Sequence, residues 1–288
     1  MIKWFAGLLL LACYLVTNIS DAAVHHERYP QLPAGAAGTT VILIHGWSCD
    51  SSYWNAQLAA LREHFEVVTV DLAGHGQTPV TRVDFSMVSF GRDVTEVVAR
   101  LPADQSIILV GHSMGGPVAV EAAVLLGGRV RGVIGVDTFA SIGLPKPTPA
   151  ESAARLAAFE RDFYTTTHAF VSQSFFRSDA DPLLRERIAS DMASADPKVA
   201  LAAIQGLNDW DGTQRLPLLK QPIATINSDQ VALDEAKLQR YAPSFRLITL
   251  AGQGHFLMME NPARFNPVLI DTIREMLDDQ RAAVSASR

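Results

Sequence analysis

The sequence feature that most constrains the fold is a series of short apolar runs separated by helical patterns. Six runs rich in Val and Ile have the length of strands buried on both faces; they cover about 40–44, 66–71, 106–111, 132–137, 222–227 and 245–250. Helical patterns occupy 53–64, 86–101, 114–127, 231–241 and 262–279. Strands that alternate with helices predict an α/β fold, with a mostly parallel, doubly wound sheet covered by helices on both faces.

One interval breaks this alternation. Residues 138–220 contain no convincing strand and hold several amphipathic stretches, such as ESAARLAAFERDFYTTTHAFVSQSFF. We expect a helical cap inserted between two late strands, above the carboxyl edge of the sheet, where open α/β folds bind ligands. The chain is therefore expected to consist of a core, residues 24–137 and 221–288, and a cap.

The first 23 residues have the pattern of a targeting segment. Lys3 precedes an apolar run, and small residues then lead to an expected cleavage site near Ala22 or Ala23. This pattern predicts a signal peptide and an exported protein, periplasmic or secreted. As an alternative, the segment LLAC, ending at Cys13, resembles a bacterial lipoprotein box, which would attach the chain to a membrane through a lipid. The apolar run is too short and too poorly flanked for a stable membrane span.

Charge and cysteine content narrow the functional classes. The formal net charge is −6 and the sequence pI is about 5.7, whereas a nucleic-acid partner would require a basic surface. Of the two cysteines, Cys13 lies in the predicted signal, so the mature chain would keep only Cys49 and no internal disulfide. Metal-binding spacings such as CxxC and HExxH are absent, and we expect neither a metal site nor a cofactor. The sequence leaves the oligomeric state open.

A single serine lies between glycines where the third apolar run passes into an alanine-rich helical segment. Gly111 and Gly115 flank Ser113 at two residues on either side, as G-x-S-x-G. On a sharp strand-to-helix turn these neighbours come too close to carry side chains, and the serine hydroxyl is lifted above the sheet. The N–H groups and dipole of the following helix favour a developing negative charge there. We therefore predict that Ser113 is a nucleophile.

Together with three further segments, this turn resembles the α/β-hydrolase superfamily over nearly all of the mature chain. The segment HGW, which ends at Trp47, resembles the HG-x motif whose last residue donates a backbone N–H to an oxyanion hole. The second donor implied by the resemblance is the N–H of Met114. DLAGHGQT, residues 71–78, resembles the D-x-x-G-x-G-x-S segment. GQGHFLMMENP, residues 252–262, resembles the loop of the catalytic histidine, which would be His255.

Two aspartates could complete a triad with this histidine. Asp229 follows the strand after which the superfamily most often carries its acid, although Asn227 stands where a glycine is common. Asp137 follows an earlier strand, where some relatives carry the acid instead. We favour Asp229 as the acid and keep Asp137 as the alternative, because the order of Ser, acid and His fits either.

The resemblance implies a serine hydrolase that cleaves a small to medium apolar ester through an acyl-enzyme. Alternatives on the same triad are a C–C bond hydrolase, a perhydrolase or haloperoxidase-like enzyme, and a ligand-binding receptor with little or no turnover. We expect His45, Gly46, His112 and Tyr53 to contact the substrate. The cap adds aromatic candidates for an acyl or aryl pocket: Phe159, Phe163, Tyr164, Phe170, Phe175, Phe176 and Trp210.

Overall fold

The computed structural model describes residues 23–32 and 38–286, so the predicted signal segment up to residue 22 lies outside the described residues. A seven-stranded sheet forms the centre of the molecule, in the order β1-β3-β2-β4-β5-β6-β7. The strands are β1 (His26–Tyr29), β2 (Thr39–Ile44), β3 (Glu66–Val70), β4 (Ser106–His112), β5 (Val130–Val136), β6 (Ile223–Ser228) and β7 (Arg246–Leu250). The six predicted strands are thus confirmed, and they pair in parallel.

The strand β1 was not predicted, because it carries no apolar run. Its sequence is HERY and its side chains are partly or fully exposed. It pairs antiparallel with β3 at the edge of the sheet, with His26 opposite Val70. Arg28 also forms an ion pair with Glu66 of β3. A charged edge strand of this kind protects the sheet from pairing with another chain.

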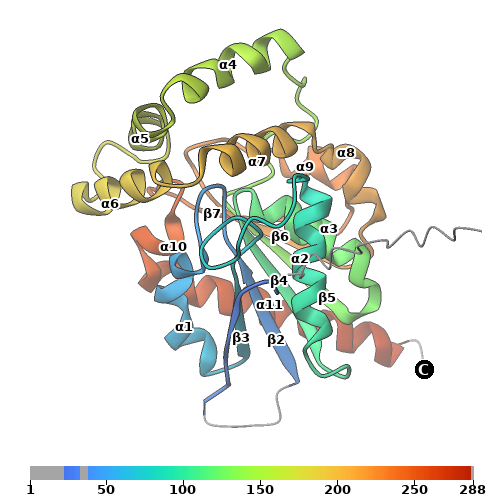
Figure 1. Cartoon of the computed structure of the whole chain (residues 1–288). Helices are drawn as coiled ribbons and strands as arrows, with labels where there is room; N and C mark the ends of the chain where they lie inside the picture. The colour runs from blue at the N-terminus through green and yellow to red at the C-terminus, as the bar shows by residue number, and fades with distance from the viewer. Residues whose placement is uncertain (1–22, 33–37, 287–288) are drawn as a thin grey trace, which may run out of the picture.

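Helices cover both faces of the sheet, as the alternation predicted (Figure 1). On one face, α2 (Met87–Ala99) and α3 (Gly115–Leu126) pack against each other. On the other face, α1 (Asn55–Arg62) packs against α11 (Pro262–Ala286). The helix expected at 231–241 is much shorter, α9 (Glu235–Gln239), and begins where the Asp234 carboxylate accepts a hydrogen bond from Lys237 N. None of the described helices is long and apolar enough to cross a membrane.

The helical insertion between β5 and β6 is confirmed. It contains α4 (Pro149–Arg161), α5 (Phe163–Ser174), α6 (Pro182–Ala193) and α7 (Pro197–Asp209), and the short α8 (Gly212–Arg215) leads back toward the core. Three of these helices begin with a Thr-Pro or Asp-Pro pair, in which the first side chain caps the helix and proline fits its first turn. Figure 1 shows α4 and α5 farthest from the sheet, with α7 between them and the core.

Helix α7 is packed directly onto loops of the core. A Cβ on Gly206 would lie 2.4 Å from the carbonyl oxygen of Phe85, so only glycine permits this approach. In the same way a Cβ on Gly74, at the turn after β3, would lie 2.8 Å from a methyl carbon of Val199. The indole N–H of Trp47 donates to the carbonyl of Ala200 at 2.8 Å. The inner layer of the cap is therefore fixed to the core.

Candidate active site

Ser113 occupies the strained turn that the sequence predicted. Its φ is 51°, in the left-handed region that non-glycine residues rarely adopt, between the end of β4 and the start of α3. A Cβ on Gly111 would lie 2.0 Å from the carbonyl oxygen of Gly115, and one on Gly115 would lie 2.6 Å from that of Ile44. Both flanking glycines are therefore required by close backbone contacts, which the turn creates.

The acid that contacts His255 is Asp137. One oxygen, Oδ2, lies 2.6 Å from His255 Nδ1, and the other accepts a hydrogen bond from the N–H of Ser228 at 2.7 Å. Burial by itself raises the pKa of Asp137, but the hydrogen bond and charge of His255 and the Ser228 N–H outweigh it, and the pKa lies below its usual value. An ionised carboxylate can only accept, so Nδ1 carries the proton and Nε2 keeps a lone pair.

The structure corrects our preference for Asp229. Its carboxylate is 40% exposed and accepts hydrogen bonds from the N–H of Gly252 at 2.9 Å and from Arg177 at 3.4 Å. The two aspartates follow neighbouring strands, β5 and β6, but only Asp137 has a φ of 46°, in the left-handed region. Asp229 instead connects the loop after β6 to the start of the histidine loop, through its hydrogen bond with Gly252.

Glu260 holds the backbone on both sides of His255, and the sequence analysis did not identify it. Its carboxylate accepts hydrogen bonds from Gly254 N at 2.8 Å and from Phe256 N at 3.1 Å. A Cβ on Gly254 would lie 2.7 Å from the same carboxylate. Burial raises the pKa of Glu260 above its usual value. The acidic residue five positions after the histidine was the available signal, but its backbone partners could not be read from the sequence.

Two backbone N–H groups beside Ser113 are available for an oxyanion. Within the described residues, neither Trp47 N nor Met114 N donates to a protein acceptor. Met114 precedes α3 directly, at the positive end of the helix dipole. A Cβ on Gly46 would lie 3.3 Å from the Cβ of Ser113, so the segment that leads into Trp47 passes against the serine. The expected oxyanion donors therefore lie next to this residue, although neither Trp47 nor Met114 is among the residues that line its pocket.

His45 is a structural residue rather than a substrate contact. It is fully buried; its Nε2 accepts a hydrogen bond from Leu72 N at 3.0 Å and its Nδ1 donates to the carbonyl of Gly46 at 2.8 Å. Burial lowers the pKa of His45, which keeps the ring neutral in this tautomer. His45 thereby links the segment of Trp47 to the loop after β3, and neither His45 nor Gly46 is part of the pocket that contains Ser113.

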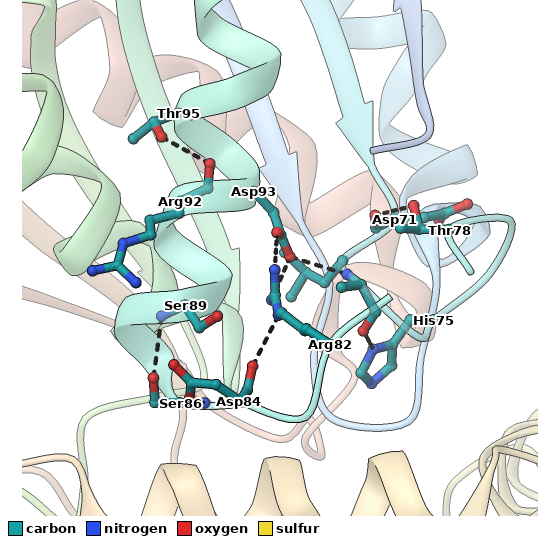
Figure 2. A network of polar contacts seen from close by, with 12 residues as sticks. Asp71, His75, Thr78, Arg82, Asp84, Ser86, Ser89, Arg92, Asp93 and Thr95 are labelled. Carbon is teal, nitrogen blue, oxygen red and sulfur yellow. Dashed lines mark hydrogen bonds and ion pairs between the residues drawn. The ribbon is translucent and has the colours of Figure 1, made fainter. Parts of the chain in front are cut away.

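The loop after β3, residues 71–78, is held by the polar network of Figure 2. Asp93 of α2 accepts a hydrogen bond from Ala73 N at 3.0 Å and forms an ion pair with Arg82. The hydroxyl of Thr78 donates to the carbonyl of Asp71 at 2.6 Å and closes the loop. Through His45, this network supports the position of the Trp47 segment.

His112 and Tyr53 also lie outside that pocket. His112 is buried, its Nε2 lies 3.0 Å from the carbonyl oxygen of His255, and the two rings are 4.7 Å apart. Tyr53 donates to Asp191 of α6 at 2.6 Å and faces a different cavity, between α1 and α6. The expectation that these residues contact the substrate is corrected: His112 supports the histidine loop, and Tyr53 joins core and cap. Cys49, next to Tyr53, is buried, and burial raises the pKa of its thiol.

The pocket that contains Ser113, Asp137 and His255 has a volume of about 900 Å³. Of the cap aromatics that the sequence singled out, Phe175 and Trp210 line it. The loop of residues 138–146 contributes nine further lining residues, and the sequence analysis did not identify it. Apolar side chains in the wall are Pro117, Phe139, Ala140, Ile142, Leu144, Pro145, Leu207 and Val231. Charged and polar side chains are also present, among them Lys146, Arg155, Asp211, Asn208 and Gln230. The pocket can hold a medium-sized ligand with apolar and polar parts.

A family model described as "Alpha/beta hydrolase family" matches residues 41–268. Among curated proteins, a pimeloyl-[acyl-carrier protein] methyl ester esterase of Nitrosospira multiformis is 29% identical, over 79% of this chain and 92% of its own length. An uncharacterized protein of Mycobacterium tuberculosis is 26% identical, over 90% of this chain and 81% of its own length.

Solved structures show the same fold. A thermophilic esterase from Thermogutta terrifontis matches with a TM-score of 0.75 and 25% identity, over 88% of this chain and 93% of that one. A bromoperoxidase from Bacillus anthracis matches with a TM-score of 0.75 and 22% identity, over 89% of this chain and 98% of that one.

Proposed function

The chain belongs to the alpha/beta hydrolase family, and we propose that it hydrolyses carboxylic esters of small to medium apolar substrates through an acyl-enzyme on Ser113. The observation that carries this proposal is the contact of 2.6 Å between Asp137 and His255, in the same pocket as Ser113. It leaves His255 Nε2 as the proton acceptor for the serine hydroxyl.

In this mechanism Ser113 attacks the ester carbonyl carbon while His255 Nε2 takes its proton. The carbonyl oxygen becomes an oxyanion and accepts hydrogen bonds from the N–H groups of Trp47 and Met114. Asp137 keeps the proton of His255 on Nδ1 and stabilises the imidazolium. The imidazolium then protonates the leaving alcohol, and a water molecule, deprotonated by His255, releases the acid from Ser113. Removal of one oxyanion donor typically costs about 2.7–4 kcal/mol of barrier.

Ester chemistry is supported by relatives as well as by the site. The Nitrosospira multiformis relative is named as a methyl ester esterase, and the Thermogutta terrifontis structure is that of an esterase. A serine at the strained turn between β4 and α3 suits acyl transfer. The apolar part of the pocket wall suits the hydrocarbon portion of such a substrate.

The test is hydrolysis of p-nitrophenyl esters of graded acyl length, from acetate to dodecanoate. We expect the wild type to hydrolyse the shorter members and Ser113→Ala to lose at least about 10³-fold in kcat. Ser141→Ala is the matched control, because Ser141 lines the same pocket outside the catalytic group. Absence of hydrolysis of every ester by the wild type would contradict the proposal and favour a different reaction or a binding role.

We also propose that the chain is exported through the signal sequence that begins with Lys3 and its apolar run. N-terminal sequencing of the mature protein should then start near Val24. An intact Met1 in the cytoplasmic fraction would contradict export, and a diacylated Cys13 would replace cleavage near Ala22 by lipid attachment.

A further inference from the structure

A buried carboxylate lies on the face of α3 that continues away from the nucleophile. Pro117 and Glu121 are four residues apart within α3, so they share one side of the helix, which begins two residues after Ser113. Ser113 and Pro117 line the pocket. Glu121 is one turn farther, about 6 Å beyond Pro117 along the axis, and is completely buried. The proposed mechanism has no role for this carboxylate.

Both carboxylate oxygens of Glu121 accept hydrogen bonds from two side chains of the segment that returns from the cap to the core. Its Oε1 accepts hydrogen bonds from the indole N–H of Trp210 at 2.7 Å and from Arg215 Nε at 2.7 Å. Its Oε2 accepts from Arg215 Nη2. The hydrogen bond to Glu121 raises the pKa of Arg215. A buried carboxylate needs such partners, and in return it fixes them in one position.

Trp210 is held at both ends of its ring system. Its N–H is bound by Glu121, and at the opposite edge its Cζ3 would lie 2.8 Å from a Cβ on Gly212. Ile142 packs against the same glycine, 2.6 Å from that Cβ position. Trp210 and Ile142 both line the pocket of Ser113. The indole is therefore a wall of this pocket that is bound by Glu121 and packs closely against Gly212.

We infer that Trp210 is a specificity-determining residue, and that Glu121 and Arg215 are its positioning residues: the indole limits the length of the substrate group that extends from Ser113 along α3. The inference rests on the proposed ester hydrolysis. The indole lines the same pocket of about 900 Å³ as Ser113, so a substrate group that reaches it must stop there or displace it. One methylene that does not fit is worth about tenfold or more in kcat/KM.

The experiment compares kcat/KM for two ester series, one with increasing acyl length on p-nitrophenol and one with increasing alcohol length on acetate. For Trp210→Ala we expect the ratio of kcat/KM for long esters to kcat/KM for short esters to rise about tenfold or more in one series. Tyr164→Ala is the control, because Tyr164 is an exposed cap aromatic outside the pocket.

Variants of Glu121 separate positioning from a merely structural role. Glu121→Leu removes both acceptor oxygens and should raise the same ratio, whereas Glu121→Gln keeps one oxygen for the indole N–H and should stay close to wild type. Thermal unfolding identifies any variant that does not fold, and Trp210→Phe, which keeps a ring but lacks the N–H, then replaces Trp210→Ala. An unchanged length profile in folded Trp210 variants would overturn the inference. Absence of wild-type hydrolysis of any ester would instead overturn the proposed function.

Discussion

The carbonyl oxygen of Phe175, at the end of α5 in the cap, accepts a hydrogen bond from the backbone N–H of His255 at 2.8 Å. The two rings are also in contact, with centroids 4.4 Å apart. The loop that carries the proposed general base is therefore supported from the cap as well as from the core, where Glu260 binds its backbone. The cap therefore helps to position His255 in addition to covering the pocket.

Phe175→Ala should lower kcat roughly two- to tenfold, the size of a lost aromatic contact, because His255 loses a ring that restricts its orientation. The backbone hydrogen bond remains, so the protein should stay folded. Steady-state kinetics with p-nitrophenyl acetate would measure the change, and Phe175→Leu should fall between the alanine variant and wild type. A change in KM with kcat unchanged would show that Phe175 acts only as pocket wall.

Asp137→Asn should lower kcat by up to about 10⁴-fold, because an amide that donates to Nδ1 favours the wrong tautomer of His255. Asp229→Asn is the matched control and should change kcat by less than about threefold, since among the described residues its carboxylate is hydrogen-bonded to Gly252 and Arg177 and not to His255. Equal losses in the two variants, or a larger loss in Asp229→Asn, would return the acid to Asp229.

The choice between these aspartates shows where sequence reasoning ended. Apolar runs determine which segments become strands. Parallel pairing then brings the carboxyl ends of β5 and β6, and the aspartates that follow them, to the same edge of the sheet. The choice then depends on the left-handed φ of 46° at Asp137 and on the Ser228 N–H that holds its other oxygen. Neither this backbone angle nor this backbone contact can be recognised from a pattern in the sequence. Ser113 and its glycines were predictable because steric contact restricts the residue types themselves.

The pocket wall was predictable only in part for a related reason. The sequence analysis named seven aromatic residues of the cap as candidates, and Phe175 and Trp210 are among them. The sequence could not show that these two, of the seven, line the pocket of Ser113. His45 and Tyr53 lie next to the right segments in sequence, yet their side chains turn into the core and toward α6. Side-chain direction after a loop depends on packing between distant segments.

Gly111→Ala should destabilise the protein by about 1–3 kcal/mol or more, because the new methyl would lie 2.0 Å from the carbonyl oxygen of Gly115. Gly128→Ala is the control, since a Cβ there has no heavy atom within 4 Å. Chemical denaturation would compare the two free energies of unfolding. Equal stabilities would mean that the turn around Ser113 is less tightly packed than described.

Buried neutral histidines should make the protein less stable in acid. Burial lowers the pKa of His75 and of His112 to about 3 in the folded state, against about 6.5 when unfolded. Below pH 6.5 the unfolded chain binds protons that these rings cannot, so stability should fall as the pH drops from about 6.5 toward 3, by up to about 1.4 kcal/mol per pH unit for each histidine.

Denaturation curves of wild type and His75→Asn across pH 4–8 would isolate one of these contributions. The variant should lose less stability than wild type between pH 6.5 and 4, and the difference between them should be constant above pH 7. Parallel curves over the whole range would contradict a neutral, buried His75.

The proposed reaction requires that Ser113 be a nucleophile activated by His255. The most direct measurement is incubation of the purified protein with a fluorophosphonate, followed by intact-mass and peptide mass spectrometry. We expect one covalent phosphonyl adduct per chain, located on Ser113, absent from Ser113→Ala and formed at least about 100-fold more slowly in His255→Ala. A wild-type protein that remains unlabelled, or an adduct that persists in Ser113→Ala, would contradict it.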